Sequence, residues 1–169
     1  MKTSVSMAAI AVAVGVGFIA GFVTSGRPVH AQTRASATEP VATKDEFSSH
    51  VIHYPDLPPV ELVKGSNSRL IAGEQSMISF LKMDAHSYFA PHHHTQEQIM
   101  IVLDGSCDEI IEGKLYHVSK GDVIVLPPNI VHGAYIGDQD VNVIDVFGEV
   151  RSDYMLKLEQ KAAQLNKKK

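Results

Sequence analysis

The chain has 169 residues and a mass of 18.4 kDa, which fits one domain better than two because domains usually contain about 100–150 residues. Apolar residues make up 44% and charged residues 20%, and these proportions exclude a wholly disordered or collagen-like chain. A single cysteine, Cys107, excludes an intramolecular disulfide framework and a cysteine-rich zinc site. With nine histidines in the chain, any metal site is expected to use nitrogen and oxygen ligands.

The N-terminal segment 1–31 has the layout of a secretory signal peptide. Lys2 precedes an uncharged apolar stretch over 7–23, and small residues surround the expected cleavage site after Ala31. Glycines within the apolar stretch weaken a permanent helix, so we expect cleavage and a periplasmic or secreted mature protein. An uncleaved membrane anchor is the alternative, because the stretch approaches the length of about 20 residues that spans a bilayer.

Cleavage would leave an acidic protein with a flexible start. Loss of Lys2 and Arg27 lowers the formal net charge from −4 to −6. An acidic domain repels phosphate backbones, so we expect no nucleic-acid partner, and we expect membrane contact only if the signal is uncleaved. Segment 32–46 is rich in Ala, Thr and Ser without periodicity, which predicts a flexible linker before a domain that begins at residue 47.

Strands and tight turns dominate the predicted domain over 47–151. Segments rich in Val and Ile adjoin turn residues such as Asp104-Gly105, and no helical pattern lies between them. This pattern predicts an antiparallel sandwich or barrel rather than alternating strands and helices. After Arg151, apolar residues recur at helical spacing and predict a closing helix with a basic tail over 152–169. The expected strands are 76–82, 98–103, 107–111, 114–118, 122–126 and 140–147.

A run of three histidines carries the clearest chemical signal. In an extended chain alternate side chains share a face, so His92, His94 and Gln98 point one way and His93 the other. Two imidazoles and an amide oxygen on one face of a sheet form part of a coordination shell for a divalent ion such as Fe, Mn, Ni, Cu or Zn. His132, which follows a strand and a proline-stiffened turn, is the candidate third imidazole. A solvated histidine loop and a hydrogen-bonded structural His132 are the alternatives.

The combined spacing resembles the two-part sequence signature of the cupin family over residues 76–147. The resemblance implies an all-β fold, the cupin double-stranded β-helix or jelly-roll barrel, followed by a short C-terminal helix. It also implies one divalent metal ion bound by His92, His94, Gln98 and His132. The positions that match the signature are His92, His94, Gly105, Gly121, Pro127 and His132.

Four positions depart from this signature. His86 and Asn129 replace its two turn glycines, and Ile136 replaces a polar residue that is seldom a ligand. Gln98 replaces the usual glutamate, so a set of neutral ligands would leave the full charge of the ion to act on an anionic substrate. Glu97 could supply a carboxylate only through a register slip that turns it off the ligand face.

The last predicted strand places Asp145 among apolar neighbours, which is costly for an ionisable group without a partner or a task. Its spacing to Arg151 leaves two interpretations open, a salt bridge and a catalytic pair. Segment 145–154 (DVFGEVRSDY) resembles the ending of small single-domain cupins that open unsaturated uronates in pectin and alginate breakdown. That resemblance implies that Asp145 and Arg151 assist the chemistry, although Glu149 and Val150 stand where prolines are usual.

These features together predict an exported metal-binding cupin that acts on a small anionic molecule. Ring opening or isomerisation of an unsaturated sugar acid is the leading hypothesis. An iron-dependent dioxygenase and a non-catalytic sugar- or metal-binding cupin are the alternatives, because one fold hosts many chemistries. Similarity to small exported cupins also implies a homodimer.

Overall fold

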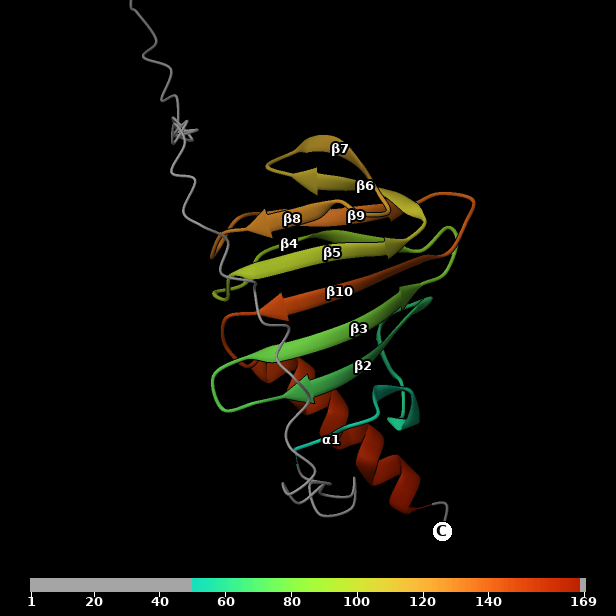
Figure 1. Cartoon of the computed structure of the whole chain (residues 1–169), viewed down its shortest axis with the longest axis vertical. Coiled ribbons are helices and arrows are strands. Elements are labelled where there is room, and N and C mark those ends of the chain that lie inside the picture. The colour runs from blue at the N-terminus through green and yellow to red at the C-terminus, as the bar shows by residue number, and fades with distance from the viewer. Residues whose placement is uncertain (1–49, 168–169) are drawn as a thin grey trace, which may run out of the picture. The chain divides into compact units, whose positions relative to one another are not determined.

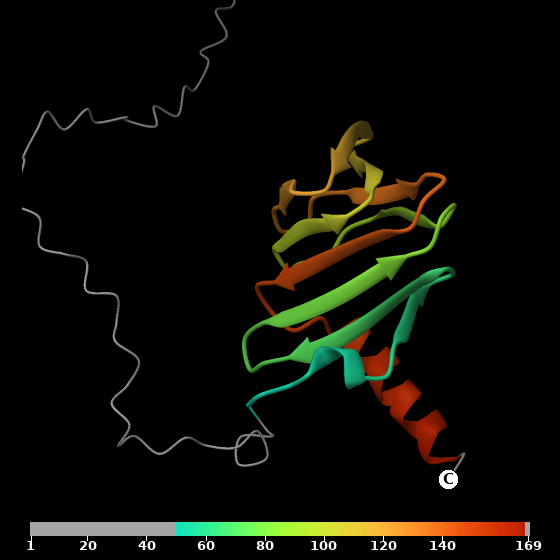
Figure 2. The same cartoon turned by 45° about the vertical axis from the view of Figure 1, so that its right-hand side comes forward.

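The computed structural model describes residues 50–167, so the predicted signal (1–31) and linker (32–46) lie outside the described residues. The described part of the chain forms strands followed by one α-helix (Figures 1 and 2). The elements are η1 (Tyr54–Asp56), β1 (Val60–Val63), β2 (Ser66–Ala72), β3 (Met77–Met83), β4 (Tyr88–His92), β5 (Gln98–Asp104), β6 (Ser106–Ile111), β7 (Lys114–Ser119), β8 (Val123–Leu126), β9 (His132–Ile136), β10 (Val141–Phe147) and α1 (Ser152–Asn166).

The strands pair antiparallel in two sheets. One sheet has the order β1-β2-β3-β10-β5-β8 and the other the order β4-β9-β6-β7. Alternate side chains of β2, β3, β5 and β10 are buried in the core between the sheets, which is the arrangement expected of a jelly roll. The predicted all-β jelly-roll class with a C-terminal helix is therefore confirmed.

Strand β10 shows how the alternation builds the core. Val141, Val143, Asp145 and Phe147 are buried, and the residues between them are only partly covered. β10 lies between β3 and β5, where Asp145 pairs with Ser79 on one side and Met100 on the other. A carboxyl group is thereby held in the interior by the same period-two pattern that buries its apolar neighbours.

The six predicted strands correspond to β3, β5, β6, β7, β8 and β10, whereas β1, β2, β4 and β9 were not predicted. The last three of these contain residues that are poor strand formers, including Pro91 in β4 and Gly133 in β9. Gly133 is required by close packing, because a Cβ atom there would lie 2.5 Å from the carbonyl oxygen of Phe89. Local propensity is low in these strands, so tertiary packing decides their conformation.

Two of the departures from the cupin signature preserve its turns. His86 and Asn129 both have φ of 63°, the left-handed conformation that glycine adopts most easily. The Asn129 N–H donates a 2.7 Å hydrogen bond to the carbonyl oxygen of His94. The turn before β9 is thus tied to the loop that carries His94.

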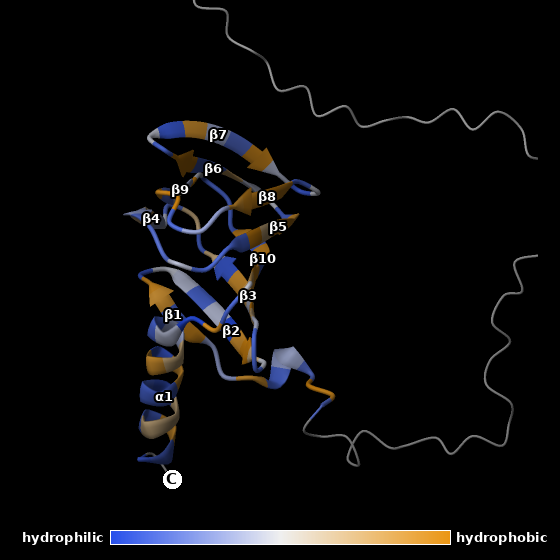
Figure 3. Cartoon of the chain, turned by 90° about the vertical axis from the view of Figure 1, so that its left-hand side faces the viewer, coloured by the Kyte–Doolittle hydropathy of each residue, from blue (hydrophilic) through white to orange (hydrophobic). Residues whose placement is uncertain are grey.

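The helix α1 closes one end of the six-stranded sheet. Tyr154, Met155 and Leu158 pack against the core, and Figure 3 shows hydrophilic and hydrophobic bands alternating along α1. Lys157 of α1 donates a hydrogen bond from Nζ to the carbonyl oxygen of Glu61 in the edge strand β1, at 3.5 Å. Among residues 50–167, no helix has the length and hydrophobicity that a membrane span requires.

Candidate metal centre

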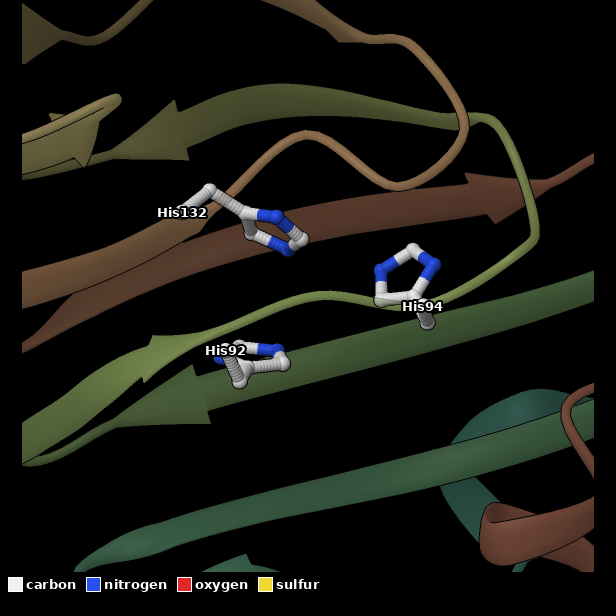
Figure 4. Close-up of side chains that lie close together, drawn as sticks. All are labelled: His92, His94 and His132. Atoms are coloured by element: carbon white, nitrogen blue, oxygen red, sulfur yellow. The ribbon is translucent and has the colours of Figure 1, made fainter.

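Three imidazoles from separate positions in the chain converge between the sheets (Figure 4). His92 ends β4, His94 lies in the loop before β5, and His132 begins β9. The pairing of β4 with β9 places His92 opposite His132, with ring centroids 4.5 Å apart. One nitrogen from each ring lies within 4.8 Å of the others, a spacing at which all three can bind one ion.

The backbone determines which nitrogen is available on two of these rings. Nδ1 of His92 lies 2.9 Å from the carbonyl oxygen of Ala90, and Nδ1 of His132 lies 2.9 Å from that of Ile130. A carbonyl oxygen only accepts, so each ring is protonated on Nδ1 and presents the lone pair of Nε2. Nε2 of His132 is buried without a hydrogen-bond partner. A divalent metal ion would satisfy this lone pair, and the residues therefore fit a metal site.

Gln98 is held beside the histidines with its oxygen toward them. Its amide N–H donates to Asp145 Oδ1 at 2.8 Å, and its Oε1 lies 3.1 Å from Nε2 of His94. The amide oxygen is thereby positioned as a fourth possible ligand. Glu97 is exposed, as is His93, which agrees with the opposite orientation that strand alternation predicts for them.

A second hydrogen bond holds the carboxyl group of Asp145. The hydroxyl of Ser79 hydrogen-bonds to Asp145, and Ser68 and Ser79 share a 2.8 Å hydrogen bond in the core. Burial nevertheless raises the pKa of Asp145 to about 7, against the opposing effect of these hydrogen bonds. A carboxyl group with this pKa can both accept and donate a proton near neutral pH.

Burial lowers the pKa of two of the three imidazoles, His94 and His132. Burial lowers the pKa of His132 to about 4, and burial followed by the positive charge of Arg151 lowers the pKa of His94. Neutral imidazole is the form that binds a metal ion, so the low pKa values keep these lone pairs available.

Arg151 is buried next to the site but does not form the salt bridge with Asp145 that was one of the two interpretations. It donates two hydrogen bonds to the carboxylate of Asp153, from Nε at 2.9 Å and from Nη2 at 2.7 Å. Its guanidinium carbon lies 4.3 Å from the ring centroid of Tyr154 and 5.3 Å from that of Phe147. Nη1 is buried without a partner and is the free donor of this group.

Residues 79–147 match the sequence model of the cupin domain. The chain contains a cupin domain. KdgF from Halomonas sp. is 28% identical, with a TM-score of 0.56, over 61% of this chain and 94% of that chain. An RmlC-like cupin from Shewanella frigidimarina is 21% identical, with a TM-score of 0.58, over 62% of this chain and 95% of that chain.

The polyketide cyclase RemF from Streptomyces resistomycificus is also similar to the cupin domain. It is 22% identical, with a TM-score of 0.54, over 60% of this chain and 80% of that chain. At such low identity, this structure and the Shewanella cupin show the fold alone. No curated protein sequence matches the chain significantly.

A small cavity that opens to solvent adjoins the histidines inside the cupin domain. Of its polar residues, two were given no role in the sequence analysis, Glu109 of β6 and Tyr154 of α1. The sequence does contain an indication for Glu109. It stands two residues after the apolar Cys107 in a strand, so the two side chains share the inward face. The cavity is lined by Leu81, Met83, Phe89, His92, Gln98, Met100, Glu109, His132, Gly133, Ala134, Asp145 and Tyr154.

Proposed function

We propose that the protein is a metal-dependent isomerase that opens the ring of a small unsaturated sugar acid. The observation that carries the proposal is the hydrogen bond from Gln98 to Asp145, which places a proton-exchanging carboxyl directly beside the candidate ligands. A divalent ion bound by His92, His94, Gln98 and His132 would act as a Lewis acid on a substrate oxygen.

The side chains around the ligands have separate roles in this proposal. Asp145 takes the proton of a substrate hydroxyl as the ring opens, because its pKa of about 7 suits proton transfer at neutral pH. Arg151 binds the substrate carboxylate through Nη1, the guanidinium donor that Asp153 leaves free. The cavity is small and partly apolar, which suits a monomeric sugar acid better than a polymer.

Similarity to other proteins supports the same substrate class. Segment 145–154 resembles the ending of small cupins that open unsaturated uronates, and it contains both Asp145 and Arg151. The 28% identity to KdgF extends over 94% of that protein, so the likeness is not restricted to this ending.

Turnover in the absence of oxygen tests the proposal. The purified protein, with its metal content measured by elemental analysis, is incubated with a 4,5-unsaturated uronate under nitrogen, and the open-chain keto product is followed by NMR. We expect conversion. Iron content with oxygen consumption and no conversion under nitrogen would instead identify a dioxygenase, and binding without conversion would identify a non-catalytic cupin.

We also propose that the protein is exported and forms a homodimer through the outer face of the six-stranded sheet. The residues of this face alternate with the buried core and form two apolar rows across the strands. Val123 and Val125 at its edge are each 57% exposed, an unusual position for apolar side chains in a monomer. The rows are Ile71-Ile78-Val146-Ile99-Val125 and Phe80-Ile144-Ile101-Val123.

Native mass spectrometry of the protein from the periplasmic or secreted fraction tests both parts of this proposal. We expect a mature chain that begins at Gln32 and a particle of twice its mass. Val123→Asp should convert the dimer to a monomer, since it places a charge in the apolar interface. Leu115→Asp, on the 62% exposed Leu115 of the other sheet, is the matched control and should leave the dimer intact. A wild-type chain that retains residues 1–31 would contradict export with cleavage of the signal. A monomeric wild-type protein would contradict the homodimer.

A further inference from the structure

Glu109 is a buried carboxyl group in the same cavity, and the proposed function does not use it. It is 3% exposed and lies on β6, where it pairs with Ala134 of β9 and Tyr116 of β7. Its hydrogen bond comes from the thiol of Cys107 at 3.9 Å, and no Lys or Arg of residues 50–167 forms an ion pair with it. A carboxyl group buried with so little compensation destabilises the fold, which points to a task in the cavity.

Glu109 and Asp145 belong to opposite sheets. Asp145 is on β10 of the six-stranded sheet, and Glu109 is on β6 of the four-stranded sheet. Both line the cavity that also contains His92, Gln98 and His132. A small molecule in this cavity therefore meets one carboxyl group from each of two facing walls.

The two carboxyl groups differ in their environments. Asp145 accepts a hydrogen bond from Gln98 and one from Ser79, whereas Glu109 has the weak thiol donor of Cys107. Burial raises the pKa of Glu109 to about 8, and the nearby charge of Asp145 contributes. The amide and hydroxyl donors stabilise the ionised form of Asp145, whereas Glu109, with one weak donor, is left to its neutral, protonated form. Two carboxyl groups whose environments separate their protonation in this way serve as the acid and the base of one reaction.

We propose that Glu109 is the acid of the site, which protonates the substrate carbon while Asp145 deprotonates the substrate hydroxyl. This inference rests on the proposed function and deepens it. It divides between two residues the two proton transfers that the ring opening of an unsaturated uronate requires.

The electron flow balances without an oxidant or reductant. Asp145 takes the proton of the anomeric hydroxyl, and the O–H electron pair forms the aldehyde C=O bond. The bond from the anomeric carbon to the ring oxygen breaks, and its electrons form the C=O bond at C5. The electrons of the C4=C5 double bond then take the proton of Glu109, so C4 becomes a CH2 group. Substrate and product are isomers, and one proton returns from Asp145 to Glu109 through the shared cavity before the next turnover.

The experiment compares wild type, Glu109→Gln and Glu159→Gln with a 4,5-unsaturated uronate in D2O. Glutamine retains the shape of Glu109 but has no acidic proton, so kcat should fall by about 100-fold or more while KM changes little. The wild-type product should carry deuterium at a single stereochemical position of C4. In Glu109→Gln an enol would leave the site and ketonise in water, so deuterium should appear at both positions. Glu159 is exposed on α1, and Glu159→Gln is the matched control that should behave as wild type.

Each result decides a separate question. Unchanged kcat and single-position deuteration in Glu109→Gln, with an active wild type, would overturn the role of Glu109 and leave the proposed function standing. A wild type that does not convert the uronate would overturn the proposed function and this role with it.

Glu109→Leu is the second variant, and its folding and metal content are verified alongside. It is expected to fold because it removes an uncompensated buried carboxyl group. It should lose turnover as Glu109→Gln does, and full activity would again overturn the role.

Discussion

Asp145→Asn should lower turnover of a 4,5-unsaturated uronate by about 10²–10⁴-fold, the usual contribution of a general acid–base residue. Asparagine has the same shape and its amide oxygen still accepts the hydrogen bond from Gln98 Nε2, so the orientation of Gln98 is retained. What is lost is the proton-exchanging group with a pKa of about 7. Steady-state kinetics together with elemental analysis check this prediction, since the metal content should equal that of wild type.

The control for this change is Asp138→Asn. Asp138 is exposed in the loop before β10, and the same loss of a carboxylate there should leave turnover within about two-fold of wild type, as is usual for surface substitutions. If Asp145→Asn turned over the uronate at the wild-type rate, the acid–base role of Asp145 would be contradicted. Loss of activity accompanied by loss of metal would instead show that Asp145 acts by holding Gln98 in place.

His132→Ala should weaken divalent metal binding by more than about 100-fold, because changes in groups that merely support a ligand already weaken it by about 10–100-fold. His132 is buried at the start of β9, and its unpartnered Nε2 lies within reach of the ligand atoms of His92 and His94. Removal of this imidazole leaves two histidines and Gln98. Metal titration followed by calorimetry measures the loss. The metal-dependent rise in melting temperature should disappear with it, because a ligand that binds only the folded state stabilises that state.

His93→Ala is the matched control within the histidine run. His93 is exposed between two candidate ligands, so its loss should leave metal affinity unchanged. Equal losses in His93→Ala and His132→Ala would indicate nonspecific binding to the histidine-rich loop. Retention of tight binding in His132→Ala would exclude His132 as a ligand.

The fold and the ligand candidates follow from sequence because both depend on local periodicity. Alternation along 140–147 predicts the inward position of Asp145, and alternation through the histidine run separates His92, His94 and Gln98 from His93. Asn129 has the left-handed backbone expected of a turn residue at its position. Such features need only the geometry of neighbouring residues.

Strands with weak propensity required tertiary information. The inward positions of β2 carry Ser66 and Ser68, and β9 contains Gly133, so neither segment shows the pattern of an ordinary strand. Ser68 is nevertheless useful in the core, because its hydroxyl hydrogen-bonds to Ser79, which in turn contacts Asp145. Polar groups buried as a hydrogen-bonded set are compatible with a strand, but the partners become visible only when the sheets are assembled.

The nine histidines and single cysteine by themselves indicated that a metal site would use nitrogen and oxygen ligands, and the spacing predicted which residues would supply them. The tertiary structure alone decided how the remaining groups are placed. Arg151 pairs with Asp153 instead of Asp145, and Glu109 faces the cavity from the opposite sheet. The physical reason is that sequence periodicity defines the face of a strand on which a side chain lies. The partner of a buried charge depends on which strands the fold brings together.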